Sequence, residues 1–454
     1  MHRVFKSTEI RGPCPGVFSA DMAWKIGHAT ALFLQRSRHN IDESRRVANE
    51  NAIVIGRDNR PTSEMIAAAL SDGIRSAGAH VMDLGAVDTP MVWFAANHLQ
   101  AVGAVQVTAS GDPASENGLK IAGPGARPIT GASGLQDIRR IATLLRVGRT
   151  GLSGRYERCD VRDAYSQRLR RTLRLSRGVR LLADAGEGVA AVMLHAVFAG
   201  IEGLAMTLME EPPHADRTPD AGEHSLDALG TAVRAGGFDA GVWFDRDADR
   251  CALVAETGQT IPADAVLALL ACNMLQEPAC AGACIVHDVR CGTAALRAMQ
   301  RAGAVLCRQR SGSAHIAAAL AETGGLLGGD YRGRYCFRDS FFRESPATAL
   351  ALVLSILSAE QRPLSALAAP YMPAARISNA RIEVRDPEAS LRELGRAYRA
   401  SRIDYLDGLT ISDARWRCTI RKGEGEAALY LDMEADDRQT LDEKFADVVR
   451  TARQ

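Results

Sequence analysis

Short apolar runs alternate with amphipathic stretches along most of the chain. The apolar runs have the length and β-branched content of buried strands, and the stretches between them place apolar residues at helical spacing. This alternation is typical of α/β domains, and it is repeated three times. The predicted strands are residues 52–56, 80–84, 102–108, 179–183, 204–209, 240–244, 283–287 and 304–308, and the predicted helices are residues 63–77, 189–199 and 292–302.

The carboxyl-terminal portion has a different pattern, with strands in quick succession. Such spacing predicts a small antiparallel α+β layer. A chain of 454 residues is too long for one core and has room for three or four domains of roughly 100–200 residues each. We place the domains at residues 1–152, 153–257, 258–370 and 371–454. The predicted carboxyl-terminal strands are residues 381–384, 409–412, 416–420 and 427–433, and the helices are residues 388–400 and 437–450.

Three carboxylates follow the predicted strand 240–244 at alternate positions: Asp245, Asp247 and Asp249. Alternate side chains of an extended or tightly turned loop converge on one side, so three oxygen donors can close on a hard divalent cation. Magnesium is the first candidate, because the zinc ligands His and Cys and the calcium loop of an EF-hand are both missing here. The alternative is a solvated acidic turn with an arginine counter-ion.

A second candidate segment follows the predicted strand 102–108, where a small-residue turn exposes Ser110 and the next strand carries Lys120. A serine in this position can carry a phosphoryl group, which the aspartate metal site and the lysine would neutralise. Only five of the 55 basic residues are lysines. A compact ammonium suits a point contact to phosphate or a proton transfer, whereas guanidinium does not lose its proton. The alternative is a surface lysine on an edge strand.

These segments resemble motifs of the α-D-phosphohexomutases, the phosphomannomutase/phosphoglucomutase group, along nearly the whole chain and in the same order. Residues 5–12 resemble F-K-x-Y-D-I-R-G, residues 55–60 G-x-D-x-R, residues 83–85 with 89–90 D-x-G and T-P, residues 108–110 the start of T-A-S-H-N-P, residues 245–250 D-G-D-x-D-R, residues 328–334 G-E-x-S-G-H and residues 421–426 the start of R-x-S-N/G-T-x-P.

The resemblance implies a fold class of three similar α/β domains with mixed sheets and a smaller carboxyl-terminal α+β domain around a central cleft. In chain order the domains would carry a phosphoserine loop, a metal-binding loop, a sugar-binding loop and a degenerate phosphate-binding loop. The implied enzyme is a phosphosugar mutase that moves a phosphoryl group between the 1- and 6-positions of a hexose phosphate, of mannose or glucose. It would use a phosphoserine, a bisphosphate intermediate, Mg²⁺ and a hexose bisphosphate as primer.

The resemblance also implies a role for each candidate residue. Ser110 would carry the phosphate, and Lys120 or Arg11 would stabilise charge near the transferring group. Arg250 would orient a phosphate or a ring hydroxyl, or would pair with the aspartates. The implied metal ligands are Asp245, Asp247, Asp249 and a phosphate oxygen on Ser110. The implied substrate-binding residues are Asp330, Arg332, Arg334 and Arg421. We interpret Arg57 and Arg60 as structural, since arginines at a helix entry usually pair with nearby carboxylates.

Several residues depart from the family pattern, and they leave two functions open. The first is a divergent mutase in which Arg332 and Arg334 form a relocated phosphate clamp. The second is a catalytically weak or inactive homologue that binds a sugar phosphate or a protein. We favour the first, because the serine, the lysine and all three aspartates are present together. The departures are Gly111 and Asp112 for His-Asn, Arg246 for Gly, Asp330, Arg332 and Arg334 for Glu, Ser and His, and Glu424 and Glu426 in the phosphate loop.

Composition limits the remaining classes. No apolar run has membrane-spanning length and the amino terminus lacks a signal-peptide core, so we expect a cytoplasmic protein without a membrane partner. Ten cysteines without regular spacing predict free thiols. A net charge of +1 without a basic cluster argues against nucleic acid, and no nucleotide-binding glycine motif follows a strand. Protein partners and oligomeric state stay open.

Overall fold

The computed structural model describes residues 1–37, 48–148, 153–186, 188–209, 221–423 and 426–454, with the backbone alone for residues 221–225. The chain forms two compact units, one of Met1–Ile261 with Arg332–Ser365 and one of Pro262–Tyr331 with Ala366–Gln454. The predicted class of α/β domains with mixed sheets and a carboxyl-terminal antiparallel sheet is confirmed. The four domain boundaries stay predictions.

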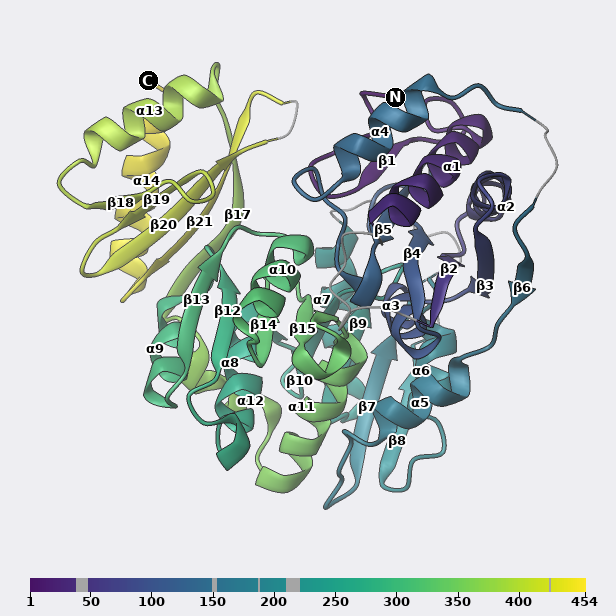
Figure 1. The fold of residues 1–454 in the computed structure, drawn as a ribbon. Coiled ribbons are helices and arrows are strands. Elements are labelled where there is room, and N and C mark those ends of the chain that lie inside the picture. The colour runs from purple at the N-terminus through teal and green to yellow at the C-terminus, as the bar shows by residue number, and fades with distance from the viewer. Residues whose placement is uncertain (38–47, 149–152, 187, 210–220, 424–425) are drawn as a thin grey trace. The chain divides into compact units, whose positions relative to one another are not determined.

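The first sheet of the first unit is mixed (Figure 1). Its parallel strands β4, β2, β3 and β6 continue into the antiparallel strands β5 and β1, so that β5 lies beside β4. Every residue of β4 is buried, which agrees with a sequence that is apolar except for Gln106. In sheet order the strands are β1 (Ile10–Pro13), β5 (Glu116–Ala122), β4 (Ala101–Val107), β2 (Asn49–Arg57), β3 (His80–Ala86) and β6 (Tyr156–Arg158).

The helices of this part are α1 (Ala20–Ser37), α2 (Ser63–Ser76), α3 (Thr89–His98) and α4 (Leu135–Leu144), with a 3₁₀ turn at Pro124–Ala126. Helix α1 packs against both α2 and α4. Gly27 and Gly73 allow α1 and α2 to touch backbone to backbone, since a Cβ on Gly73 would lie 2.0 Å from the carbonyl oxygen of Trp24. Helix α3 packs on β2 and β4, and eight of its ten residues are buried.

The second sheet has the order β11 (Thr260–Ile261), β10 (Cys251–Ala255), β9 (Ala240–Phe244), β7 (Val179–Asp184) and β8 (Leu204–Leu208). Strands β9, β7 and β8 are parallel, whereas β10 turns back antiparallel to β9 with Cys251 opposite Phe244. The six residues 245–250, here called the metal loop, therefore form the connection of a hairpin. The helices are α5 (Arg162–Arg170), α6 (Ala190–Phe198) and α7 (Ala221–Gly236).

The first unit also contains the hairpin β15 (Tyr335–Phe337) and β16 (Arg343–Glu344), a 3₁₀ turn at Arg338–Ser340 and helix α11 (Pro346–Glu360). In the second unit, β13 (Val305–Gln309), β12 (Cys284–Asp288) and β14 (Leu327–Gly329) are parallel neighbours. The helices around them are α8 (Ala263–Met274), α9 (Thr293–Arg301) and α10 (Ser313–Thr323), with 3₁₀ turns at Pro278–Cys280 and Ala369–Tyr371, and α12 (Leu364–Ala368) begins in one unit and ends in the other.

The carboxyl-terminal sheet is antiparallel throughout, as predicted. Helices α13 and α14 pack against each other and on this sheet (Figure 1). Its strands, in sheet order, are β17 (Ala375–Glu383), β21 (Ala428–Ala435), β20 (Trp416–Lys422), β19 (Leu409–Ser412) and β18 (Arg402–Asp404), and the helices are α13 (Pro387–Ala397) and α14 (Arg438–Ala452).

Every strand predicted from the sequence is present, but β17 begins six residues before the predicted residue 381. A register shift between Ile377 and Ala380, with Asn379 at a φ of 52°, breaks the alternation that would have revealed its first half. Helices such as α8 and α11 were not predicted. Both are buried over most of their surface, and a helix that is apolar all round shows no helical periodicity.

All ten cysteines are free thiols, as predicted. Among the residues that the structure describes, no helix has the length and apolar character needed to cross a membrane.

The contact between α1 and α2 gives a stability prediction. We expect Gly73→Ala to lower the free energy of unfolding by about 1–3 kcal/mol, because the new methyl group meets the rigid backbone of Trp24. Gly148→Ala is the control, since a Cβ at Gly148 would meet open space. Urea unfolding followed by tryptophan fluorescence measures both variants, and equal effects would contradict the close helix contact.

Candidate functional site

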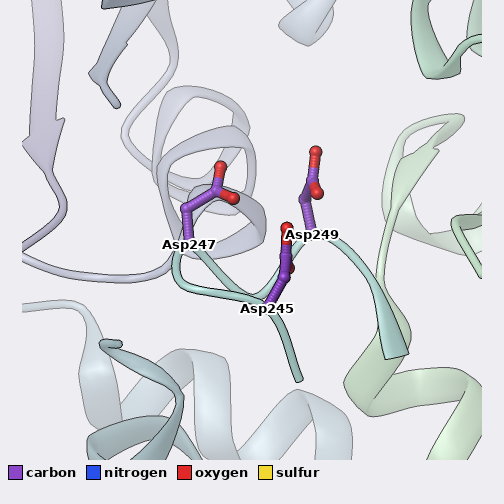
Figure 2. A group of neighbouring side chains, drawn as sticks. All are labelled: Asp245, Asp247 and Asp249. Carbon is purple, nitrogen blue, oxygen red and sulfur yellow. The ribbon is translucent and has the colours of Figure 1, made fainter. Parts of the chain in front are cut away.

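The three aspartates of the metal loop are buried together. Asp245, Asp247 and Asp249 each offer a carboxylate oxygen, and these oxygens lie within 4.8 Å of one another. Figure 2 shows the three side chains leaving one loop and pointing to the same side. A solvated acidic turn would leave such groups exposed. Here Ala248, at a φ of 50°, helps to turn the loop so tightly that alternate side chains converge.

Ser110 lies at the centre of these carboxylates. It follows β4, is buried, and has a φ of 53°, in the left-handed region that non-glycine residues rarely adopt. Its hydroxyl donates to Oδ1 of Asp247 at 2.8 Å and lies 3.4 Å from Oδ2 of Asp245 and from Oδ1 of Asp249. The fold thus brings together two segments that the sequence analysis selected separately.

Lys120 approaches the same group from β5. Its Nζ lies 2.6 Å from Oδ2 of Asp247, 2.7 Å from Oδ2 of Asp249 and 3.4 Å from Oγ of Ser110. Burial by itself would lower the pKa of Lys120, but the two carboxylates outweigh it and raise the pKa above its ordinary value. The lysine is therefore a charged contact in this arrangement and not a surface residue.

Two arginines complete the charge balance of the metal loop. Nε of Arg250 lies 2.7 Å from Oδ2 of Asp245, and Nε of Arg334 lies 3.1 Å from Oδ2 of Asp249. Burial raises the pKa of Asp245 to about 7 even though Arg250 opposes the shift. Burial also acts on Asp249, but Arg334 and Lys120 attract its charge and hold the pKa well below the usual range. Three carboxylates thus face three cations.

The added charge of Asp112 is neutralised. Its carboxylate lies 2.8 Å from Nη1 of Arg11, whose Nη2 lies 2.9 Å from Glu9. The neighbouring Gly111 serves a different purpose, since a Cβ there would lie 2.2 Å from Nη2 of Arg250. The glycine in place of the expected histidine leaves room for Arg250 beside the serine.

Arg60 anchors residues 108–113, here called the serine loop, through their backbone. Its guanidinium is fully buried and pairs with Asp58 at 3.1 Å, which confirms the predicted structural pairing. Arg57 likewise pairs with Glu64 at 3.3 Å. Sequence reasoning missed the four backbone carbonyls to which Arg60 also donates: those of Ser110 at 2.6 Å, Asp112 at 2.7 Å, Pro113 at 2.6 Å and Glu116 at 3.1 Å.

Asp58 extends this support to the amide of the serine. Its Oδ2 accepts a hydrogen bond of 2.7 Å from Oγ1 of Thr108, which in turn accepts one of 2.8 Å from the backbone N–H of Ser110. The motif at residues 55–60 contained the signal, a carboxylate and an arginine two residues apart. The spacing of this pair could not show that Asp58 contacts Thr108 or that Arg60 contacts the carbonyl of Ser110.

Thr89 is a second residue that the sequence analysis quoted without giving it a role. It starts α3, and its hydroxyl donates to Oδ2 of Asp247 at 2.5 Å. The sequence signal was the T-P pair after Asp88, which marks a helix start and nothing more.

The predicted substrate-binding residues are divided between the two units. Asp330 and Arg421 belong to the second unit and Arg332 and Arg334 to the first. Asp330 is buried, and its charge adds to burial in raising the pKa of Asp288 to about 7. The guanidinium of Arg421 lies 5.7 Å from the ring centre of Tyr331, and its Nε is buried without a hydrogen-bond partner among the described residues. Glu424 lies outside the described residues.

Comparison with protein families gives a consistent result along the chain. Residues 2–144 match the phosphoglucomutase/phosphomannomutase alpha/beta/alpha domain I, residues 163–258 match domain II, and residues 262–374 match domain III. The phosphomannomutase of Salmonella typhimurium is 30% identical over 450 residues, which cover 95% of this chain and 94% of that protein. Phosphohexose mutases of Xanthomonas campestris are 29% identical over 443 residues, with 95% and 94% coverage.

Solved structures agree. A phosphoglucomutase/phosphomannomutase family protein from Burkholderia thailandensis has a TM-score of 0.84 and 27% identity, covering 100% of this chain and 98% of that one. The N-acetylphosphoglucosamine mutase of Aspergillus fumigatus, solved with GlcNAc-6P and magnesium, has a TM-score of 0.59 and 12% identity, with 99% and 96% coverage. At 12% identity, the similarity to the Aspergillus fumigatus enzyme concerns the fold alone.

The carbonyl contacts of Arg60 predict a large effect of a conservative change. We expect Arg60→Lys to lower the free energy of unfolding by about 3–5 kcal/mol, because one ammonium cannot replace the donors that bind four carbonyls and Asp58. Arg57→Lys is the matched control and should cost no more than about 1 kcal/mol, since Glu64 is exposed. Urea denaturation checks both, and a small effect at Arg60 would show that the loop holds itself.

Proposed function

Since the chain belongs to the phosphoglucomutase/phosphomannomutase family, we propose that it interconverts the 1- and 6-phosphates of mannose or glucose through a phosphoserine at Ser110. Membership makes the protein an intramolecular phosphotransferase of the hexose-phosphate mutase class. The observation that carries the proposal is the place of the Ser110 hydroxyl, within 2.8 to 3.4 Å of three carboxylates and a lysine.

The donor set of the metal loop fits Mg²⁺. Three buried carboxylates within 4.8 Å supply the hard oxygen ligands that this ion prefers, and an oxygen on Ser110 lies within reach of all three. Asp245, Asp247 and Asp249 would hold the ion. When bound, Mg²⁺ supplies positive charge that stabilises a phosphoryl group on the serine.

The surrounding charges favour joint binding of the metal and the phosphate. When all three carboxylates are ionised, they and the three cations Lys120, Arg250 and Arg334 sum to zero charge. A phosphoserine adds about −1.5 to −2 charges at pH 7, and a divalent cation adds two positive ones. Either partner alone would leave a strongly charged buried site, whereas both together restore neutrality.

The chain's own residues then have distinct tasks. Ser110 accepts and returns the phosphoryl group, and Lys120, charged and 3.4 Å from its hydroxyl, stabilises the negative charge of transfer. Arg250 lies against the serine loop at Gly111 and orients phosphate oxygens. Arg11, which pairs with both Asp112 and Glu9, acts on the charge near the transferring group by offsetting the carboxylate beside the serine.

Substrate recognition is the part most changed from the family pattern. We assign the sugar and its second phosphate to Asp330, Arg332, Arg334 and Arg421, with the arginines supplying charge-assisted contacts to phosphate. A hexose bisphosphate would serve as primer, because it can phosphorylate a serine that has lost its phosphate. A cytoplasmic location stays a prediction.

Turnover and phosphorylation test this proposal directly. We expect the protein with Mg²⁺ and glucose 1,6-bisphosphate to convert glucose 1-phosphate or mannose 1-phosphate to the 6-phosphate, and its intact mass to rise by about 80 Da on treatment with the bisphosphate. Ser110→Ala should abolish both signals. Ser115→Ala, a change at an exposed serine of the same segment, should leave both intact. Absence of both signals in the wild type would refute the mutase and leave a binding protein.

The charge balance predicts a link between phosphorylation and metal affinity. We expect the phosphorylated protein to bind Mg²⁺ at least about tenfold more tightly than the dephosphorylated one, since opposite unit charges about 4 Å apart attract by about 4 kcal/mol near a protein surface. Calorimetry on protein treated with bisphosphate or with phosphatase measures the difference. Ser110→Ala should show none, and equal affinities in the wild type would contradict the shared site.

A further inference from the structure

The start of helix α3 faces the metal loop. Thr89 is the first residue of the helix, after the cap residue Asp88, and both are buried. The backbone N–H of Thr89, which has no partner inside its own helix, donates to the carbonyl oxygen of Asp247 at 2.9 Å. The hydroxyl of the same residue donates to Oδ2 of Asp247 at 2.5 Å. Thr89 therefore donates hydrogen bonds to both the backbone and the carboxylate of Asp247.

These contacts fix the rotation of the Asp247 carboxylate. Oδ2 accepts hydrogen bonds from Thr89 and, at 2.6 Å, from Lys120, so that both of its lone pairs are used. Among the residues that the structure describes, Oδ1 accepts a single bond, from the hydroxyl of Ser110 at 2.8 Å. A second lone pair is thus left on the oxygen that faces the serine, where a shared cation would need it.

Asp247 differs from its two neighbours in the kind of partner that holds it. Asp245 pairs with the guanidinium of Arg250, and Asp249 pairs with the guanidinium of Arg334 and, like Asp247, with Lys120. A neutral hydroxyl and Lys120 hold Asp247. A cation entering the site is repelled by an arginine or a lysine but not by a hydroxyl. Thr89 can therefore keep its contact when a positive ion is bound.

The start of helix α3 is itself anchored to β4, the strand that precedes Ser110. The Asp88 carboxylate accepts hydrogen bonds from the N–H of Met91 at 2.9 Å and from the hydroxyl of Tyr165 at 3.2 Å. Gln106 on β4, the strand that leads to the serine, donates to the carbonyl of Val87 at 3.0 Å. Thr89 thus ties the metal loop to the strand of the first sheet that presents Ser110.

We propose that Thr89 is a positioning residue, which sets the Asp247 carboxylate for a divalent cation and holds the metal loop in register with the serine. This proposal rests on the metal site that the proposed function includes. It concerns the affinity for Mg²⁺, which is measured without any turnover. Partners that orient a metal ligand typically contribute a factor of about 10–100 in affinity.

The test is Mg²⁺ binding to the full-length, dephosphorylated protein by calorimetry. Thr89→Val keeps the shape of the side chain and removes the hydroxyl, so we expect about 10–100-fold weaker Mg²⁺ binding. Thr89→Ser restores the hydroxyl and should bind within about threefold of the wild type. Thr348→Val is the matched control, because it removes another buried threonine hydroxyl of the same unit, one bonded to Ser345 at 2.7 Å. It should leave Mg²⁺ affinity unchanged.

The outcomes separate positioning from general stability. Urea unfolding without metal should give similar midpoints for Thr89→Val and Thr348→Val, and only the first should lose Mg²⁺ affinity. Equal Mg²⁺ affinity in Thr89→Val and wild type, failure of Thr89→Ser to restore it, or an equal loss in Thr348→Val would overturn the proposal. Should Thr89→Val not fold, Thr89→Cys replaces it with the same expected loss, because a thiol is a weak donor.

The proposal and the proposed function fail in different ways. A wild type that binds Mg²⁺ but shows neither turnover nor phosphoserine would refute the mutase and leave the role of Thr89 standing if the affinities follow the expected order. A wild type that binds no Mg²⁺ would overturn the role of Thr89 as well.

Discussion

The repulsion among three buried carboxylates is the constraint on which the rest of the site depends. Asp245, Asp247 and Asp249 are held within 4.8 Å of one another and away from water, so their charges must be balanced locally. The cations come from three different elements: Lys120 from β5, Arg250 from the end of the metal loop, and Arg334 from the turn before β15. Of these cations, Lys120 also lies 3.4 Å from the hydroxyl of Ser110, and Arg250 lies beside Gly111, the residue after the serine.

The same balance explains residues that depart from the family pattern. Arg250 reaches Asp245 across the space that Gly111 leaves empty, so a larger residue at that position would displace the cation. Asp112 brings an extra negative charge next to the serine, and Arg11 pairs with it at 2.8 Å. These replacements are therefore compensated within the first unit and are compatible with a working site. In the changed sugar loop Arg334 pairs with Asp249, and in the changed phosphate loop Glu426 lies 3.3 Å from Arg381.

A site of mutually repelling groups also needs a rigid frame, and two residues outside the charge cluster provide it. Arg60 binds the carbonyls of the serine loop and holds Ser110 in its left-handed conformation. Thr89 binds the backbone and carboxylate of Asp247. Both lie at the entry to a helix of the first sheet, α2 and α3, and both act on loops that follow strands. The position of the serine relative to the aspartates is thus set by backbone contacts as well as by charge.

The sequence by itself determined the strands and selected the three aspartates, the serine and the lysine as candidates, because each depends on local spacing. Alternate aspartates converge in a tight loop, and a lysine on a neighbouring strand can reach back. It also indicated the family through motif order. Only the tertiary structure decided which cation meets which aspartate, that Arg334 reaches Asp249, and that Arg60 and Thr89 support the two loops. Thr89 and Asp247 are 158 residues apart. Contacts of that kind depend on how sheets and helices pack, which no local pattern encodes.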